Sequence, residues 1–313
     1  MALMLHLTGI DEAGWAKGFS EAMPGCRVVT RSDEFDPAEI EYIFVWKPAP
    51  DAFEGLDNLK AILSLGAGVD ALLEHPALPQ VPVIRFVDDE LTHCMSDYVI
   101  SQVTMHQRLF TRYAAHQKVR AWSQLYPPAS HEITVGIMGL GVLGTDAARK
   151  LKTIGFAVNG WSRSAKSVDG VEVFAGDTRF NDFLAATDVL VCLLPLTDET
   201  RGILNMQTFR ALRRGRLVGG PVLINAARGG HQKEADIVAA LKDGTLGAAS
   251  LDVFEVEPLP RTSPLWEIEA CFITPHIAAI SNEQSGVRYF SQIIADHEAG
   301  KPLRNVVDRN RGY

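Results

Sequence analysis

The chain has 313 residues, of which 47% are hydrophobic and 22% charged, and its formal net charge is -8 at neutral pH. This length predicts about two domains, since single cores stop growing at roughly 250–300 residues, and the composition excludes disordered and fibrous classes. The negative charge disfavours nucleic acid and anionic membranes as partners, because both repel an acidic protein. A small molecule is the expected partner.

Apolar runs predict short strands at 42–46, 61–65 and 83–87, separated by segments rich in Gly, Pro and Asp. Residues 97–122 contain no Gly or Pro and precede Tyr-Pro-Pro at 126–128, which predicts one helix followed by a linker. Further apolar runs alternate with helical segments; they lie at 133–138, 157–161, 189–194, 222–225, 248–251 and 271–273. Strands of this kind are typical of parallel sheets covered on both faces, so the predicted fold class is α/β.

The N-terminal segment has no basic leader, and no stretch reaches the ~18 apolar residues of a membrane span. The four cysteines, at 26, 94, 192 and 271, show neither metal-ligand spacing nor a disulfide framework. We expect a cytoplasmic protein that binds no metal.

A glycine-rich loop follows the strand predicted at 133–138. Gly139, Gly141 and Gly144 form G-x-G-x-x-G, with Val142 and Leu143 between the last two glycines and an apparent helix beyond them. In this setting the glycines allow a tight turn, a close approach of the backbone to a pyrophosphate, and close packing of helix on strand. The loop predicts a dinucleotide site; the alternative is a glycine-rich turn without a ligand.

The acid that usually accepts the ribose hydroxyl of NAD, about 20 residues further on, is missing. The strand at 157–161 instead runs into Ser162, Arg163 and Ser164, with Lys166 just beyond. A guanidinium there can bind a 2′-phosphate, so the sequence predicts a preference for NADPH, with NADH possible. The alternative is that Arg163 is a solvated loop cation.

Three stretches after predicted strands carry candidate catalytic groups: Arg228, Glu257 and His276. The carboxyl ends of parallel strands meet at one edge of a sheet, where ligands bind. When a keto carbon accepts a hydride its oxygen needs a proton, which His276 can donate, while Glu257 favours the imidazolium and Arg228 orients substrate oxygens. Each residue taken singly has a structural alternative: a helix cap, a surface turn or a buried histidine.

Five segments together resemble the D-isomer-specific 2-hydroxyacid dehydrogenase family: GAGVD at 66–70, GLGVLG at 139–144, INAARG at 224–229, LDVFEVEPLP at 251–260 and TPHIAA at 274–279. VWKP at 45–48, FAVNGWSRSAKS at 156–167, SPLW at 263–266 and the terminal RGY are most similar to its glyoxylate/hydroxypyruvate reductases of the A type. This resemblance implies two Rossmann-like domains, with the active site in the cleft between them. Residues 1–99 and 286–313 would form the substrate-binding domain, and residues 100–285 the dinucleotide-binding domain.

The resemblance also implies roles for individual residues. Arg228 and His276 would be the active-site pair, supported by Glu257. The amides of Ala67, Gly68 and Val69 would receive the substrate carboxylate, with Trp46 at the pocket wall. Residues implied to contact the cofactor are Leu194 and Pro195, at the adenosine, and Ala226 and Asp252, at the nicotinamide amide.

We therefore predict a reductase of small 2-keto acids that forms the D-isomer, works as a homodimer and prefers NADPH. One alternative is a dehydrogenase for larger 2-keto acids; another is a regulator that senses dinucleotides without turnover. The glycine-rich turn before Arg228 and the polar sequence at 231–233 depart from the family pattern, and the pattern gives them no function. His93 is expected to be a surface or helix-end residue rather than part of the site.

Overall fold

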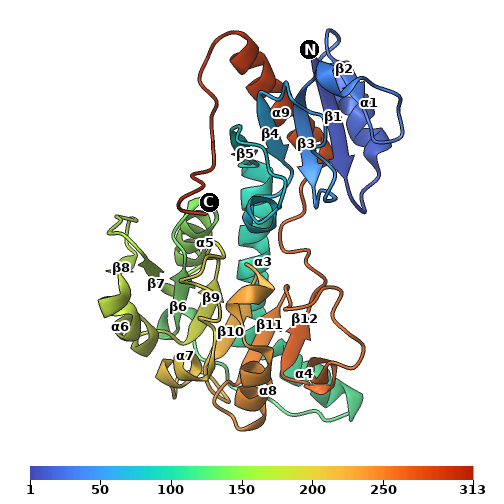
Figure 1. Cartoon of the computed structure of the whole chain (residues 1–313). Coiled ribbons are helices and arrows are strands. Elements are labelled where there is room, and N and C mark those ends of the chain that lie inside the picture. Colours follow the sequence, from blue (N-terminus) through green and yellow to red (C-terminus); the bar gives the residue numbers. More distant parts are fainter. Residues whose placement is uncertain (313) are drawn as a thin grey trace. The chain divides into compact units, whose positions relative to one another are not determined.

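The computed structural model describes residues 1–312, so Tyr313, which ends the RGY sequence, lies outside them. The chain divides into two compact units. Unit 1 comprises Met1–Leu91 and the chain from Ile280 onward, and unit 2 comprises Thr92–Ala279. The boundaries predicted at 99/100 and 285/286 fall inside α3 (Asp89–Gln107) and α9 (Glu283–Glu298). Each unit contains its own parallel sheet (Figure 1).

Unit 1 is built on a five-stranded sheet with the order β2-β1-β3-β4-β5, in which every pairing is parallel. Its strands are β1 (Ala2–Leu7), β2 (Arg27–Val29), β3 (Ile40–Trp46), β4 (Ala61–Ser64) and β5 (Val83–Arg85). Its helices are α1 (Glu12–Ala22), α2 (Asp70–Leu73) and α9, with a 3-10 turn η1 (Pro37–Glu39). After β1 the chain forms β2 on one side of that strand, and then β3, β4 and β5 on its other side. The strand order therefore reverses between β1 and β3.

The side chains of successive residues of β3 lie on opposite faces of this sheet. Ile43 and Val45 belong to the apolar cluster on one face. Phe44, on the other face, lies with its ring centroid 5.1 Å from Trp15 of α1 and 5.1 Å from Phe290 of α9. Helices from the two ends of the chain therefore complete the same hydrophobic core.

Unit 2 contains a seven-stranded parallel sheet with the order β12-β11-β10-β9-β6-β7-β8. Its strands are β6 (Thr134–Met138), β7 (Ala157–Ser162), β8 (Glu172–Ala175), β9 (Val189–Cys192), β10 (Val222–Asn225), β11 (Ala248–Leu251) and β12 (Cys271–Ile273). Its helices are α3, α4 (Phe110–Lys118), α5 (Val142–Thr153), α6 (Phe180–Ala185), α7 (Met206–Ala211) and α8 (Glu234–Lys242). Short 3-10 turns are η2 (Ser130–Glu132), η3 (Asp177–Arg179), η4 (Gly229–His231) and η5 (Pro264–Glu267). The strand order reverses between β6 and β9, which is where ligands bind in open α/β sheets.

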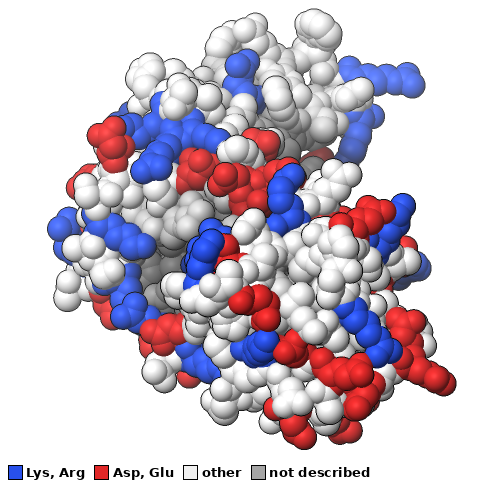
Figure 2. Space-filling model, turned by 90° about the horizontal axis from the view of Figure 1, so that it is seen from above, with Lys and Arg blue, Asp and Glu red and all other residues white. Residues whose placement is uncertain are grey.

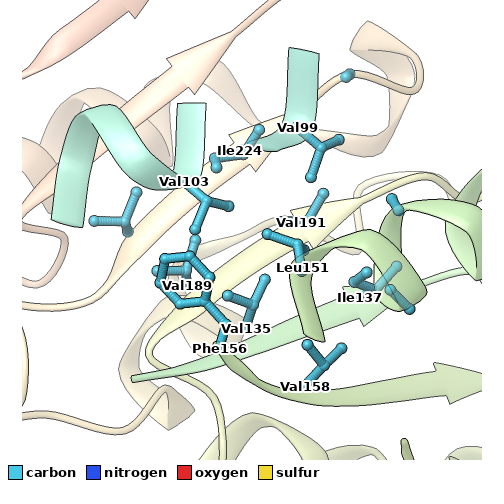
Figure 3. Packing of buried hydrophobic residues seen from close by; sticks show 14 of the residues in the cluster. Val99, Val103, Val135, Ile137, Leu151, Phe156, Val158, Val189, Val191 and Ile224 are labelled. Carbon is cyan, nitrogen blue, oxygen red and sulfur yellow. The ribbon is translucent and has the colours of Figure 1, made fainter. Parts of the chain in front are cut away.

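The strands of unit 2 are buried on both faces, as their near-continuous apolar sequences predict. Val189 and Val191 pack with residues of α3 and α5 (Figure 3), whereas Leu190 and Cys192 pack with residues of α6, α7 and α8. The prediction of an α/β fold with two parallel sheets is confirmed.

The prediction of a single helix over residues 97–122 is wrong. α3 begins earlier, at Asp89, and ends at Gln107, and α4 starts at Phe110. Between them Leu109 adopts a left-handed conformation with φ 60°, while its side chain is buried. A non-glycine residue in this region costs roughly 1–2 kcal/mol, which burial of the leucine offsets. Because the break uses neither Gly nor Pro, composition gave no sign of it.

The glycine-rich turn before β10 is explained by close packing of two backbone segments. Gly219 and Gly220 have φ values of 96° and 121°, which favour glycine. A Cβ atom on Gly247 would lie 2.7 Å from the carbonyl carbon of Gly219. The glycines thus allow the segments before β10 and β11 to approach each other.

On the surface drawn in Figure 2, basic and acidic side chains are interspersed. Within residues 1–312, no helix is long and apolar enough to cross a bilayer. Cys26, Cys94, Cys192 and Cys271 are free thiols.

Candidate active site

The predicted dinucleotide loop connects β6 to α5 at the point where the strand order of unit 2 reverses. Gly139 has φ 98°, and its amide donates to the Trp161 carbonyl oxygen at 2.9 Å. A Cβ atom on Gly144 would lie 1.9 Å from the Gly139 carbonyl oxygen. Two of the three glycines are therefore required by the chain itself, for the turn and for the packing of helix on strand.

Gly141 differs, because a Cβ atom built there meets nothing within 4 Å. It caps α5, a helix of 12 residues whose first-turn amides carry positive potential. Glycine at a position with open space leaves the backbone accessible to a ligand. The loop therefore fits a bound pyrophosphate, whose charge the helix N-terminus would stabilise.

The end of β7 carries the residues predicted to select the cofactor. Ser162 is buried and its hydroxyl donates to the Ser164 carbonyl oxygen at 2.7 Å, while Arg163 and Ser164 are exposed. The pKa of Glu199 is lowered mainly by a hydrogen bond from the Thr197 hydroxyl, and further by the Arg163 guanidinium. Lys166 donates from its ammonium group to the Leu140 carbonyl oxygen at 2.8 Å, so it supports the glycine loop. Lys166 is therefore engaged with the loop, and Arg163 remains the residue predicted to bind a phosphate on the ribose.

The remaining predicted cofactor contacts follow β9, β10 and β11. Leu194 is buried and Pro195 half-buried two and three residues after the end of β9. Ala226 directly follows β10, and its amide donates to the Cys192 carbonyl oxygen at 3.4 Å. These residues follow adjacent strands at the same edge of the sheet as the glycine loop.

His276 and Glu257 form a pair, with 2.8 Å between His276 Nδ1 and Glu257 Oε2. The other oxygen of Glu257 accepts the Phe254 amide at 3.2 Å, which fixes the carboxylate. His276 has φ 57°, and its amide donates to the Asp252 carbonyl oxygen at 2.8 Å. Because Nδ1 faces the carboxylate, Nε2 is the ring nitrogen left to exchange a proton. This is the arrangement of a general acid with an orienting carboxylate.

Asp252 holds the loop that carries His276. Its side chain is buried, and its Oδ1 accepts the Thr274 hydroxyl at 2.6 Å and the Ile277 amide at 2.8 Å. Its Oδ2 accepts the Ala278 amide at 2.9 Å. The residue implied to lie at the nicotinamide amide is therefore also the main support of the His276 loop, which the sequence did not reveal.

Arg228 is half-buried three residues after β10, where its Nη1 donates to the Ala227 carbonyl oxygen at 2.8 Å. Arg228, Glu257 and His276 follow β10, β11 and β12, which are adjacent in the sheet. The structure pairs Glu257 with His276 and places all three after the carboxyl ends of neighbouring strands. Among residues 1–312, no group of three His, Cys, Asp or Glu side chains could hold a metal ion.

The predicted substrate residues of unit 1 follow β3 and β4, which are adjacent strands. Trp46 ends β3, and a Cβ atom on Gly66 would lie 2.8 Å from the indole ring. Gly68 is exposed, whereas Ala67 is half-buried and Val69 buried. The Leu65 carbonyl oxygen accepts the Ser281 hydroxyl at 3.1 Å. This part of the candidate site is therefore mainly backbone and an aromatic ring, with one cation: Lys47 follows Trp46, and its ammonium group lies 5.7 Å from the centroid of the indole ring.

Two residues outside the site show what sequence reasoning could and could not locate. His93 is exposed on α3, as expected. His231 is fully buried beside Arg228, although the sequence assigned it no function.

A sequence profile described as "D-isomer specific 2-hydroxyacid dehydrogenase, NAD binding domain" matches residues 100–278. The chain belongs to this family. It is 39% identical over its whole length to the whole of a glyoxylate/hydroxypyruvate reductase A from Escherichia fergusonii, and 40% identical to one from Citrobacter koseri, again over both whole chains. The resemblance found in the sequence is therefore confirmed.

Solved structures of the family agree with this fold over the whole chain. An NADPH-dependent glyoxylate/hydroxypyruvate reductase from Sinorhizobium meliloti, crystallised with NADP and sulfate, has a TM-score of 0.95 and 46% identity, covering 100% of this chain and 99% of its own. A 2-hydroxyacid dehydrogenase from Xanthobacter autotrophicus, crystallised with NADPH and MES, has a TM-score of 0.94 and 40% identity over the same shares. The chain is thus a family member along its full length.

Proposed function

We propose that this chain is an NADPH-preferring reductase of small 2-keto acids, converting glyoxylate to glycolate and hydroxypyruvate to D-glycerate. The observation that carries the proposal is the pairing of His276 with Glu257 beside the strand that leads to Arg228. The names of the relatives and the NADP found in related crystals support the same substrates and cofactor.

The glycine loop and the residues after β7 would hold the cofactor. The amides at the start of α5, around Gly141, Val142 and Leu143, would take the pyrophosphate, because the chain leaves this backbone accessible. Arg163, with Ser162 and Ser164, would bind the 2′-phosphate, while Lys166 supports the loop. The other contacts would be Leu194, Pro195, Ala226 and Asp252. NADPH, when bound there, would supply the hydride.

The chain's own residues supply binding, orientation and the proton. Arg228 would hold the substrate carboxylate and polarise the keto group with its planar guanidinium. His276 would donate a proton from Nε2 to the developing alkoxide, since Glu257 lies at Nδ1 and fixes the ring. The amides of Ala67, Gly68 and Val69 would receive the carboxylate, and Trp46 would limit the size of the substrate.

The deciding experiment follows NADPH oxidation with glyoxylate, hydroxypyruvate, pyruvate and a bulky 2-keto acid. We expect the highest kcat/KM with glyoxylate and hydroxypyruvate, and a lower value with NADH in place of NADPH. Preference for the bulky acid would instead indicate a dehydrogenase for larger substrates. Absence of turnover with every acid would indicate a dinucleotide-sensing protein.

Replacement of His276 tests the proposed acid. We expect His276→Ala to lower kcat by about 10²–10⁴-fold, the usual contribution of a general acid. Glu257→Gln keeps the size of the side chain but removes its charge, so its loss should lie between wild type and His276→Ala. Full turnover by His276→Ala would exclude this histidine as the proton donor.

We also propose a cytoplasmic homodimer. The segment around α4 exposes four large apolar side chains: Phe110, Val119, Trp122 and Tyr126. An exposed apolar patch of this kind is typical of a subunit interface. Light scattering should give twice the chain mass for wild type and a monomer for Trp122→Asp; an unchanged mass would exclude this surface.

A further inference from the structure

His231 lies three residues after the proposed substrate-binding arginine and is fully buried. The distance from its Nδ1 to the Arg228 carbonyl oxygen is 3.1 Å, and that from its Nε2 to the Pro195 carbonyl oxygen is 3.2 Å. Both ring nitrogens thus lie within hydrogen-bond distance of main-chain acceptors. An apolar side chain could fill the same space but could not contact either oxygen in this way.

The two carbonyl groups belong to separate loops. Pro195 follows β9 and Arg228 follows β10, which pair with each other in the sheet. The imidazole therefore joins the loop on the predicted adenosine side to the loop that carries the guanidinium. A single ring thus contacts one carbonyl group in each of the two proposed binding loops.

Other contacts hold the backbone around His231. The Asn225 amide group donates to the Arg228 carbonyl oxygen at 3.1 Å and to Gln232 Oε1 at 2.8 Å. Gln232 Nε2 in turn donates to the Val253 carbonyl oxygen at 3.0 Å. The Leu204 amide donates to the His231 carbonyl oxygen at 2.8 Å. These contacts hold the backbone that carries the imidazole, and the ring and the Asn225 amide group lie at the same Arg228 carbonyl oxygen.

We propose that His231 is a positioning residue, which ties the Arg228 loop to the Pro195 loop and so fixes the guanidinium for the keto acid. This inference rests on the proposed function of Arg228. The site tolerates little movement of that group, since a misplacement of about 1 Å can cost roughly 100-fold in rate. We call the contact of the His231 imidazole with both loops the bridge. Its loss should therefore lower kcat/KM for the keto acid more than it weakens binding of the cofactor.

The test compares two replacements of His231. His231→Phe retains a ring of similar size without donors, and we expect kcat/KM for glyoxylate to fall by about 10–100-fold. His231→Gln retains a side-chain amide group that can donate to a carbonyl oxygen, and it should recover part of this loss. The Kd for NADPH should change by less than about threefold, because the pyrophosphate and 2′-phosphate contacts come from other loops.

His106→Phe is the matched control. His106 is also a buried histidine of unit 2, and its Nε2 lies 2.7 Å from the Ser250 hydroxyl, but it contacts neither loop. We expect this variant to lose stability yet keep kcat/KM within about threefold of wild type. An equal loss of kcat/KM in both Phe variants would show a general effect of removing a buried imidazole and overturn the proposal.

A double-mutant cycle separates a role through Arg228 from an independent one. In an Arg228→Lys background, the further loss caused by His231→Phe should shrink to less than about threefold, because the two residues act as a unit. A full additional 10–100-fold loss, or wild-type activity in His231→Phe alone, would overturn the proposal. If His231→Phe does not fold, His231→Gln in the same cycle decides the question.

Failure of the proposed function has a different outcome. In that case neither wild type nor His231→Phe would turn over any 2-keto acid. Hydrogen exchange would still test the bridge: the amides of Leu204, His231 and Gln232 should exchange faster in His231→Phe and not in His106→Phe. Unchanged exchange would refute the bridge whatever the reaction.

Discussion

The two parallel sheets present different chemistry at their carboxyl ends. In unit 1 the strands lead to an indole ring at Trp46 and to the glycine-containing backbone of 66–69. In unit 2 they lead to charged side chains, Arg163, Arg228 and His276. The same architecture therefore ends mainly in main-chain amides and an aromatic ring in one unit and in ionisable side chains in the other.

The largest effect is expected at Gly229, next to Arg228. A Cβ atom there would lie 1.8 Å from the Phe254 carbonyl oxygen, and backbone cannot yield as a side chain can. We expect Gly229→Ala to lower kcat/KM by about 100-fold or more, because the arginine loop must move. Steady-state kinetics and the thermal midpoint check this; normal kinetics would show that unit 2 does not depend on this loop geometry.

The next effect concerns pH and the core of unit 2. Burial lowers the pKa of His106 to about 4, whereas an unfolded chain has the ordinary value of 6.5. As the pH falls below about 6.5 the unfolded state binds the proton first, so stability is lost until about pH 4. At pH 5 the loss is about 2 kcal/mol, from 1.36 kcal/mol per pH unit.

Urea unfolding at pH 7 and pH 5 measures this loss, with His106→Gln as the control that removes the titrating group. The difference in stability between the two pH values should be about 2 kcal/mol smaller in the variant. An identical pH dependence in both proteins would contradict the assignment. In unit 1, burial also lowers the pKa of His6, so this comparison isolates the contribution of unit 2.

A similar or slightly smaller effect is expected when the cation proposed to bind the 2′-phosphate of the cofactor is removed. Arg163→Ala should raise the KM for NADPH by about 10–100-fold, since hydrogen bonds to a charged group contribute about 1.5–3 kcal/mol. The KM for NADH should change by less than about twofold. Lys166→Ala is the control with the smaller effect, because its ammonium group is bound to the Leu140 carbonyl oxygen. An equal increase in KM for NADPH and for NADH would exclude a role of Arg163 in recognising the 2′-phosphate.

The smallest effect is expected at Gly66 in unit 1. A Cβ atom there meets the Trp46 ring at 2.8 Å, and this half-buried side chain can shift. We expect Gly66→Ala to cost about 1 kcal/mol in stability and to raise the KM for glyoxylate by about two- to fivefold. A loss as large as that of Gly229→Ala would mean that unit 1 is as rigid as unit 2.

The sequence predicted the parallel sheets well because their strands are short, apolar and separated by clear breaks. Val189–Cys192 and Val222–Asn225 are buried on both faces. Such strands are near-continuous apolar runs, which can be recognised in a single sequence. Leu109 could not be predicted in the same way, because tertiary packing, not local composition, holds its left-handed conformation.

The candidate site was predictable where chemistry requires a particular residue type. Gly139 and Gly144 are needed by a turn and a close contact, and a histidine such as His276 by the proposed proton transfer. The contacts of Asp252 and His231 depend on which distant carbonyl and amide groups fold against them, and that information is absent from their neighbours in sequence. These supports exist only in the folded chain.

The assembly of unit 1 from both ends of the chain has a consequence during synthesis. Phe44 and Phe86 pack against Phe290 of α9, so the N-terminal strands lack their final cover until α9 leaves the ribosome. About 190 residues of unit 2 intervene, which takes roughly 10–40 s at ordinary elongation rates. Unit 2 is continuous in sequence and can fold during that time, while the apolar surface of the N-terminal strands remains available to chaperones.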